Sequence, residues 1–269
     1  MGLPRTALTL TAAVVALVFA LPAQAFALTL PRAQVHVTLE PNGVIDVLER
    51  LTVDSPTPLV GRREIAMQPG ELFAAPSIVV DGRRFEAGDA QRAGTFRVVR
   101  GTRGVRIEWR EPRGLREVRI GYRLAERPIV YRDVVDLRIA LWEQDWPVPV
   151  RLLTASLHLP RSSPARVRVW LHPSSLHASV STDRRSVRVR AREVDGTVDL
   201  RAVFPRSVLA STAGAQKKAG PGLRAILAEE RARDGGSSWW IWVIVAVVAA
   251  GAAATGAVLR RARPRPNRS

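Results

Sequence analysis

The feature that most constrains this chain is a long uncharged segment near its C-terminus. The segment Trp239–Leu259 contains no charged side chain. As an α-helix it would span about 31 Å, close to the roughly 30 Å hydrocarbon core of a bilayer. A helix on the surface of a soluble domain needs a polar face, and this segment has none. We therefore predict that residues 239–259 form a single transmembrane helix.

The residues that flank this segment predict its orientation. Three tryptophans cluster at its start, and arginines follow its end at once in a short tail, residues 260–269. Tryptophan rings settle at the headgroup level, and basic residues stay on the cytoplasmic side. We expect the tail to be cytoplasmic and the preceding domain to lie outside the cell. The predicted membrane-interface residues are Trp239, Trp240, Trp242, Arg260 and Arg261.

The N-terminus has the pattern of a secretory signal. Arg5 precedes an apolar run over residues 7–21, Pro22 breaks that run, and Ala23-Gln24-Ala25 forms a small-x-small cleavage site. We expect residues 1–25 to be removed; an uncleaved signal anchor is the alternative. Export by a cleaved signal agrees with the orientation inferred from the C-terminus, and the two signals together predict a single-pass protein of the plasma membrane.

Charge and cysteine content narrow the set of partners. The formal net charge is +17, from 41 basic and 24 acidic residues, and the chain has no cysteine. A GC-rich genome would explain the excess of arginine, yet a basic surface still attracts polyanions. Outside a cell these are lipid headgroups or acidic wall polymers, and we expect no nucleic acid partner.

Without disulfides, the exported part must be stabilised by apolar burial.

Residues 26–205 alternate apolar and polar side chains in many short runs. Val35, Val37 and Leu39 fall on one face of the first run, which ends at the turn residues Asn42 and Gly43. A period of 2 between turns indicates antiparallel strands, and Asn-Gly indicates a hairpin, since both residues tolerate positive φ. We predict an all-β ectodomain, an antiparallel β-sandwich. The expected strands are 35–39, 44–53, 105–110, 118–124, 152–159, 166–171, 187–192 and 198–204.

The composition changes after Pro205. Residues 207–222 are rich in Ala, Gly, Ser and Lys, which is typical of a linker. Pro221 then fits the first turn of a helix, and Leu223, Ile226 and Leu227 give it an apolar stripe. We expect residues 206–238 to form a linker and a short amphipathic juxtamembrane helix that lies on the domain or on the membrane surface.

Several sequence motifs are distinctive enough to compare with known families. They are Tyr131-Arg132-Asp133-Val134-Val135-Asp136-Leu137, Leu141-Trp142, Trp146-Pro147-Val148-Pro149-Val150 and Leu157-His158-Leu159-Pro160. Less distinctive are the opening run with Asn42, Gly43, Val47 and Glu49, the run Gly61-Arg62-Arg63-Glu64-Ile65, and Phe204-Pro205. Together these motifs resemble the DUF2207 family of predicted membrane proteins. The resemblance covers residues 33–235. It implies an exported β domain anchored by a membrane helix, and no assigned activity or catalytic residue.

Catalytic and metal-binding signals are weak. Four carboxylates within residues 133–145 could hold Ca²⁺ or act as acid and base, but they lack EF-hand spacing. Salt bridges to nearby Arg132, Arg138 and Arg151 are the alternative interpretation. The histidines are scattered, and no nucleophile motif or phosphate loop is present. We therefore predict no enzyme activity, cofactor or metal. The residues considered are Asp133, Asp136, Glu143, Asp145, His36, His158, His172 and His177.

Two sets of residues are candidates for binding. Trp142 and Trp146 flank a proline-containing loop, where they would either anchor a ligand or plug the end of the core. An arginine stripe on one predicted strand, with two arginines on another, would form a basic face for an anionic ligand or a solvated face that resists edge pairing. These arginines are Arg166, Arg168, Arg188, Arg190 and Arg192.

The sequence therefore favours a membrane-anchored, non-catalytic binding or interaction module outside the cell. One alternative is an envelope hydrolase or transferase that uses the Asp133–Asp145 carboxylates. Another is a structural subunit that meets other membrane proteins through the small residues of Gly251–Gly256, since such faces let helices approach closely.

Overall fold

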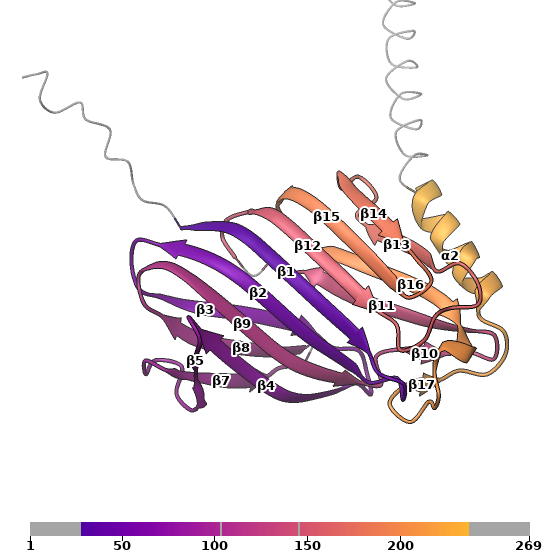
Figure 1. Cartoon of the computed structure of the whole chain (residues 1–269), viewed down its shortest axis with the longest axis horizontal. Coiled ribbons are helices and arrows are strands. Elements are labelled where there is room, and N and C mark those ends of the chain that lie inside the picture. Colours follow the sequence, from indigo (N-terminus) through magenta and orange to yellow (C-terminus); the bar gives the residue numbers. More distant parts are fainter. Residues whose placement is uncertain (1–27, 103, 145, 237–269) are drawn as a thin grey trace, which may run out of the picture.

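The structure is a computed structural model that describes residues 28–102, 104–144 and 146–236. The predicted signal peptide, transmembrane helix, tail and interface residues Trp239, Trp240, Trp242, Arg260 and Arg261 lie outside this range. The described part is mostly β, with three sheets that share one hydrophobic core (Figure 1). Its helix α2 (Leu223–Gly236) lies beside β13 and β16. No helix of the described part is long and apolar enough to cross a bilayer.

The largest sheet has eight strands and faces the viewer in Figure 1. Its strands alternate buried and exposed residues, so one face points to the core and the other, the outer face, points to solvent. In spatial order the strands are β14 (Ala178–Thr182), β15 (Ser186–Val194), β12 (Val150–His158), β1 (Thr29–Leu39), β2 (Ile45–Ser55), β9 (Gly114–Ala125), β4 (Leu72–Val80) and β5 (Arg83–Arg84).

Two smaller sheets lie behind the largest one and supply residues to the same core (Figure 1). A short 3-10 helix, η1 (Arg206–Val208), follows the last long strand. The five-stranded sheet contains β13 (Arg168–His172), β16 (Val198–Pro205), β11 (Val134–Trp142), β10 (Ile129–Val130) and β17 (Gln216–Lys217). The four-stranded sheet contains β3 (Leu59–Ala66), β8 (Gly104–Glu111), β7 (Thr95–Arg100) and β6 (Glu86–Ala87).

The sheets are mixed, and the prediction of antiparallel sheets needs correction. Each sheet contains one parallel pair, namely β1 with β12, β6 with β7, and β10 with β17. Alternation with a period of 2 is the same in parallel and antiparallel strands, so the pattern carried no information on direction. Strand β11 was not predicted because it is buried along almost its whole length and does not alternate.

The predicted first hairpin is confirmed. Strands β1 and β2 pair antiparallel around residues 40–44. Gly43 has a φ of 91°, a conformation that suits glycine. We expected Asn42 to suit the turn because it tolerates a positive φ. Its contribution is a hydrogen bond instead: its side-chain oxygen accepts from the Val44 N–H at 3.0 Å.

The segment after β16 is part of the folded domain, whereas we expected a linker. The Ala210 N–H donates to the Pro41 carbonyl at 2.8 Å, and the Gly214 N–H donates to the Asn42 carbonyl at 2.9 Å. Strand β17 then pairs with β10. We predicted a linker from the small and polar side chains of this segment. The segment is held by backbone hydrogen bonds instead, and side-chain composition does not predict those.

A close contact between two strands shapes the core of the four-stranded sheet. Gly61 on β3 lies opposite Trp109 on β8, and Trp109 is fully buried. A Cβ atom built on Gly61 would lie only 2.3 Å from Trp109 Cε2. Glycine at position 61 therefore makes room for the indole ring.

A buried ion pair connects the four-stranded sheet to the eight-stranded sheet. The Arg63 Nε on β3 donates to both carboxylate oxygens of Glu49 on β2, at 3.0 and 2.8 Å. The Tyr122 hydroxyl on β9 donates to Glu49 Oε1 at 2.7 Å. Burial, together with the Glu49 charge, raises the pKa of the Tyr122 hydroxyl well above its ordinary value.

We predict that Gly61→Ala destabilises the domain, because the added methyl group collides with Trp109. Overpacking of this kind lowers the free energy of unfolding by about 1–3 kcal/mol. Urea denaturation of the full-length protein in detergent, followed by tryptophan fluorescence, measures the change. Gly101→Ala is the matched control, since the nearest atom to its added Cβ is 3.6 Å away. Equal stabilities of the two variants would contradict the prediction.

Candidate functional site

The predicted arginine stripe lies on the outer face of the eight-stranded sheet. Arg188, Arg190 and Arg192 on β15 are exposed and alternate with buried residues. Arg188 lies 3.6 Å from Asp183, a pair too exposed to be strong. Arg190 and Arg192 form no ion pair with any residue that the structure describes.

The other two predicted arginines belong to a different sheet. Arg168 is the first residue of β13 in the five-stranded sheet, and Arg166 precedes it. Both are exposed. The structure therefore groups only the β15 arginines on one strand, and it adds others that the sequence did not indicate. The register places Arg190, Thr154, Gln34, Arg50 and Arg119 in one row across the sheet.

An open groove of about 470 Å³ lies on this face over β14, β15, β12 and β1. Within it, the register aligns Arg188, Ser156 and His36. His36 Nδ1 lies 3.0 Å from the Ser156 hydroxyl, although 120 positions separate the two residues in the chain. The side chains that line the outer face of the groove are His36, Thr154, Ser156, His158, Ser179, Ser181, Arg188 and Arg190. We define these residues as the outer groove.

The electrostatics of the outer groove favour anions. Partial burial lowers the pKa of the His36 imidazole, and the charges of Arg50 and His158 lower it further. The ring resists protonation first because it is partly buried and then because its neighbours are positively charged. A negatively charged ligand would relieve that repulsion.

Sequence reasoning did not predict the meeting of His36 and His158. It treated the histidines as scattered, and only the parallel pairing of β1 with β12 places these two in one groove. No local signal could have shown this, because the pairing joins strands about 120 residues apart in the chain.

The two loop tryptophans, named above as candidate binding residues, are core residues. Trp142 is 2% exposed and Trp146 is 7% exposed. The Trp146 ring packs edge-on against Trp109, with centroids 6.4 Å apart. Of the two interpretations, ligand anchor and core plug, their burial supports the core plug, so they are removed from the candidate binding residues.

The predicted carboxylate cluster is dispersed over separate contacts. Asp133 accepts hydrogen bonds from the Gly222 and Leu223 N–H groups, at 2.7 and 3.3 Å, and so caps the start of α2. Burial opposes ionisation of Asp133, but these hydrogen bonds outweigh it and hold the pKa of that carboxyl below its ordinary value. Glu143 accepts a hydrogen bond from the Ala66 N–H at 3.2 Å. Asp145 lies outside the described residues.

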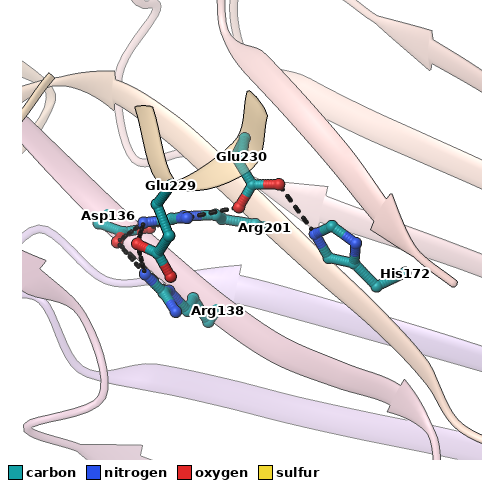
Figure 2. Close-up of polar contacts among 6 residues, drawn as sticks. All are labelled: Asp136, Arg138, His172, Arg201, Glu229 and Glu230. Carbon is teal, nitrogen blue, oxygen red and sulfur yellow. Dashed lines mark hydrogen bonds and ion pairs between the residues drawn. The ribbon is translucent and has the colours of Figure 1, made fainter. Parts of the chain in front are cut away.

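The fourth carboxylate, Asp136, belongs to a buried ionic cluster that fastens α2 to the five-stranded sheet (Figure 2). Arg201 on β16 donates to Asp136 on β11 at 2.9 and 2.7 Å. The same guanidinium contacts Glu230 on α2, and it lies 3.1 Å from Glu229. Burial would lower the pKa of Arg201, but Asp136 and Glu230 outweigh it and raise that pKa above its ordinary value. We call this group the α2 clamp.

Three further contacts complete the attachment of α2. His172 Nε2 lies 3.0 Å from Glu230 Oε2, and Arg138 bridges Asp136 and Glu229 (Figure 2). Ile226 packs into a small apolar cluster with residues of β11 and β16. The predicted pairing of Arg138 with this carboxylate group is confirmed. Within the described residues, no three His, Asp or Glu side chains are arranged to hold a metal ion.

A comparison with known protein families agrees with the family resemblance that the sequence motifs of the β domain indicated. The profile for the N-terminal domain of the predicted membrane proteins DUF2207 matches residues 29–204. The chain belongs to the DUF2207 family. The match covers the three sheets up to Phe204, so the DUF2207 domain is the β domain described above. No curated protein matches the chain.

Solved structures resemble the DUF2207 domain only distantly. A proposed nutrient-binding protein from Legionella pneumophila has a TM-score of 0.40 and 10% identity, over 66% of this chain and 67% of that chain. A proposed protease from Parabacteroides distasonis has a TM-score of 0.37 and 14% identity, over 65% and 40%. The M1 zinc metallopeptidase from Deinococcus radiodurans has a TM-score of 0.34 and 14% identity, over 66% and 42%. The chain thus spans less than half of either enzyme, and none of these likenesses indicates a function.

We predict that Arg201→Met strongly destabilises the domain, because it leaves the carboxylates of the α2 clamp buried without their cation. Removing one partner of a buried ionic group costs about 3–5 kcal/mol of unfolding free energy. Urea denaturation of the full-length protein measures this loss, and hydrogen exchange of the α2 amides shows whether the helix is released. Arg168→Met, on an exposed side chain of the same sheet, is the control. A loss no larger than that of the control would contradict a structural role for the clamp.

Proposed function

We propose that this DUF2207 protein is a single-pass plasma membrane protein whose β domain lies outside the cell and binds anionic components of the envelope, without catalysing a reaction. The observation that carries the proposal is the exposed stripe of Arg188, Arg190 and Arg192 on the outer face of the eight-stranded sheet. The opposite face of that sheet is buried in the core, so the outer face is the one that a large partner can reach.

The chemistry of these side chains supports a polyanion as the partner. A guanidinium group presents a fixed fork of donors that matches phosphate and carboxylate oxygens. Arg50 adds a further exposed guanidinium in the row of Arg190. The acids of the same face are partly neutralised already, since Asp46 pairs with Arg123 at 2.6 Å and Glu117 pairs with Arg119 at 2.6 Å.

The α2 clamp supports a membrane-proximal position for the domain. Helix α2 ends at Gly236, and the predicted transmembrane segment begins at Trp239. Because α2 is fastened to the five-stranded sheet, the tether between domain and bilayer would be short. The domain would then be held close to the headgroups and in a restricted range of orientations.

The enzymatic alternative has no supporting contact in the described part of the chain. Its three described carboxylates cap a helix, pair with arginine, or bond to a backbone N–H. They do not converge on a cavity beside Trp142 or Trp146. The structural-subunit alternative depends on residues 251–256, which lie outside the described residues.

We predict that replacing Arg188, Arg190 and Arg192 by Gln weakens binding to an anionic polymer by on the order of 100-fold, at about 1 kcal/mol for each arginine. The probe is fluorescent poly(glycerol phosphate), and the binding partner is the full-length protein in nanodiscs of zwitterionic lipid. Fluorescence anisotropy at low salt measures the affinity, which should fall as salt screens the charges.

A matched control removes the same charge elsewhere. Arg62, Arg92 and Arg113 are exposed arginines away from the eight-stranded sheet's outer face. Their replacement by Gln should change the affinity only slightly. An equal loss in both triple variants would show that net charge alone governs binding, and no binding by the unmodified protein would refute the proposal.

We also predict that protease added to intact cells digests the β domain. The cytoplasmic tail, tagged after Ser269, should then remain attached to a short membrane fragment detected by immunoblotting. Protection of the domain until the cells are lysed would contradict the proposed orientation.

A further inference from the structure

The outer groove repeats one arrangement of donors in two neighbouring rows. In the first row the register places Arg188 between Ser181 on β14 and Ser156 on β12. In the second row it places Arg190 between Ser179 on β14 and Thr154 on β12. Each of these two arginine positions therefore has a hydroxyl-bearing residue on either side of it in the sheet.

The spacing of the rows follows from strand geometry. Neighbouring strands lie about 4.8 Å apart, and positions two residues apart along a strand are separated by about 6.6–6.8 Å. The two rows thus offer two similar binding positions, side by side on one flat face. An extended chain with a regularly repeated anionic group fits such an arrangement.

The donor set favours phosphate over carboxylate. A carboxylate is planar, so the lone pairs that remain beside a bound guanidinium fork lie in the plane of that fork. The two non-bridging oxygens of a phosphodiester sit on a tetrahedral centre and accept hydrogen bonds from several directions, so hydroxyl groups that flank the guanidinium can reach them at the same time. His36 extends the first row on the far side of Ser156 and adds an imidazole donor when it is protonated.

We infer that the outer groove is a phosphate-binding site, in which two hydroxyl–guanidinium–hydroxyl rows bind successive phosphodiester groups of an envelope polymer or of lipid headgroups. This inference rests on the proposed function and specifies the ligand chemistry of the same face.

The charges around His36 make the site sensitive to pH. Arg50 on β2, His158 on β12, and Arg188 on β15 face His36 from three strands. Two acids also belong to this region. Asp46 pairs with Arg123 at 2.6 Å, and Asp183 lies 3.6 Å from Arg188 of the first row, so a phosphate bound there would compete with an exposed and weak ion pair. A bound phosphate adds negative charge beside His36, and this raises the pKa of the imidazole. By linkage, phosphate should bind more tightly as the pH falls through the pKa of His36 in the complex, and this gain is complete below the lowered pKa of the free protein.

Two polymers of similar length and charge test the inference. Poly(glycerol phosphate) carries phosphodiesters, and poly-glutamate carries carboxylates. The full-length protein in zwitterionic nanodiscs should bind the phosphate polymer at least tenfold more tightly. Replacing Ser156, Ser179 and Ser181 by Ala keeps every charge and should abolish this preference, while the affinity for poly-glutamate stays unchanged. The matched control replaces the exposed serines Ser174, Ser175 and Ser207 by Ala.

The outcomes separate this inference from the proposed function. Equal binding of both polymers by the unmodified protein, or a preference that survives loss of the groove serines, would overturn the phosphate site and leave polyanion binding in place. Failure to bind either polymer would overturn both. Displacement of the polymer by soluble short-chain phosphatidylglycerol would identify a lipid headgroup as a source of the phosphate, whereas displacement only by glycerol phosphate oligomers would identify a wall polymer.

Histidine NMR gives a second readout that does not depend on polymer affinity. The chain has only four histidines, so their ring C–H signals can be assigned by single substitutions in the full-length protein in detergent micelles. Glycerol phosphate should shift the signals of His36 and His158 and raise the pKa of His36. The signals of His172 in the α2 clamp and of His177 should not move. Equal shifts of all four, or no shift at all, would overturn the inference.

Discussion

The pairing of β1 with β12 is the constraint on which the rest of the structure depends. Residues 33–38 of β1 lie parallel to residues 153–158 of β12. Without this ladder the eight-stranded sheet would divide into a five-stranded and a three-stranded part, each with a new unpaired edge. The outer groove crosses the same junction, because His36 comes from one part and Ser156, Arg188 and Arg190 come from the other. The fold and the candidate site therefore depend on the same set of backbone hydrogen bonds.

Arginine has two separate tasks in this domain. Arg63 and Arg201 are almost fully buried. Arg63 pairs with Glu49 of another sheet, and Arg201 pairs with Asp136 of its own sheet and with Glu230 of α2. Burying such groups costs solvation, so these clusters contribute more to the relative placement of the elements than to net stability. The β15 arginines of the outer face are exposed, and Arg190 and Arg192 among them form no ion pair with a described residue. The arginine content of the sequence does not show which arginines are buried in ion pairs and which are exposed, because both kinds are the same residue.

The segment between β16 and α2 decides how freely the β domain could move relative to the proposed membrane anchor. If residues 206–222 had been a free linker, the β domain could have rotated independently of any anchor. Instead their backbone bonds to the β1–β2 turn and to β10, and Asp133 with the α2 clamp fixes the helix that follows. The domain and α2 therefore form one folded unit. A binding face on such a unit has a restricted orientation, which favours partners that are themselves laid out along the membrane surface.

The sequence by itself determined the β class, the strands that alternate clearly, the first hairpin, helix α2, and the exposure of Arg188, Arg190 and Arg192. These features depend on the period of apolar residues, on turn residues, and on composition within a few positions of the chain. Only the tertiary structure decided the parallel direction of β1 and β12, the burial of Trp142 and Trp146, the dispersal of the carboxylates, and the meeting of His36 with Ser156. The reason is that strand order and direction are set by packing between segments more than a hundred residues apart, and a local pattern is the same whichever strand becomes the neighbour.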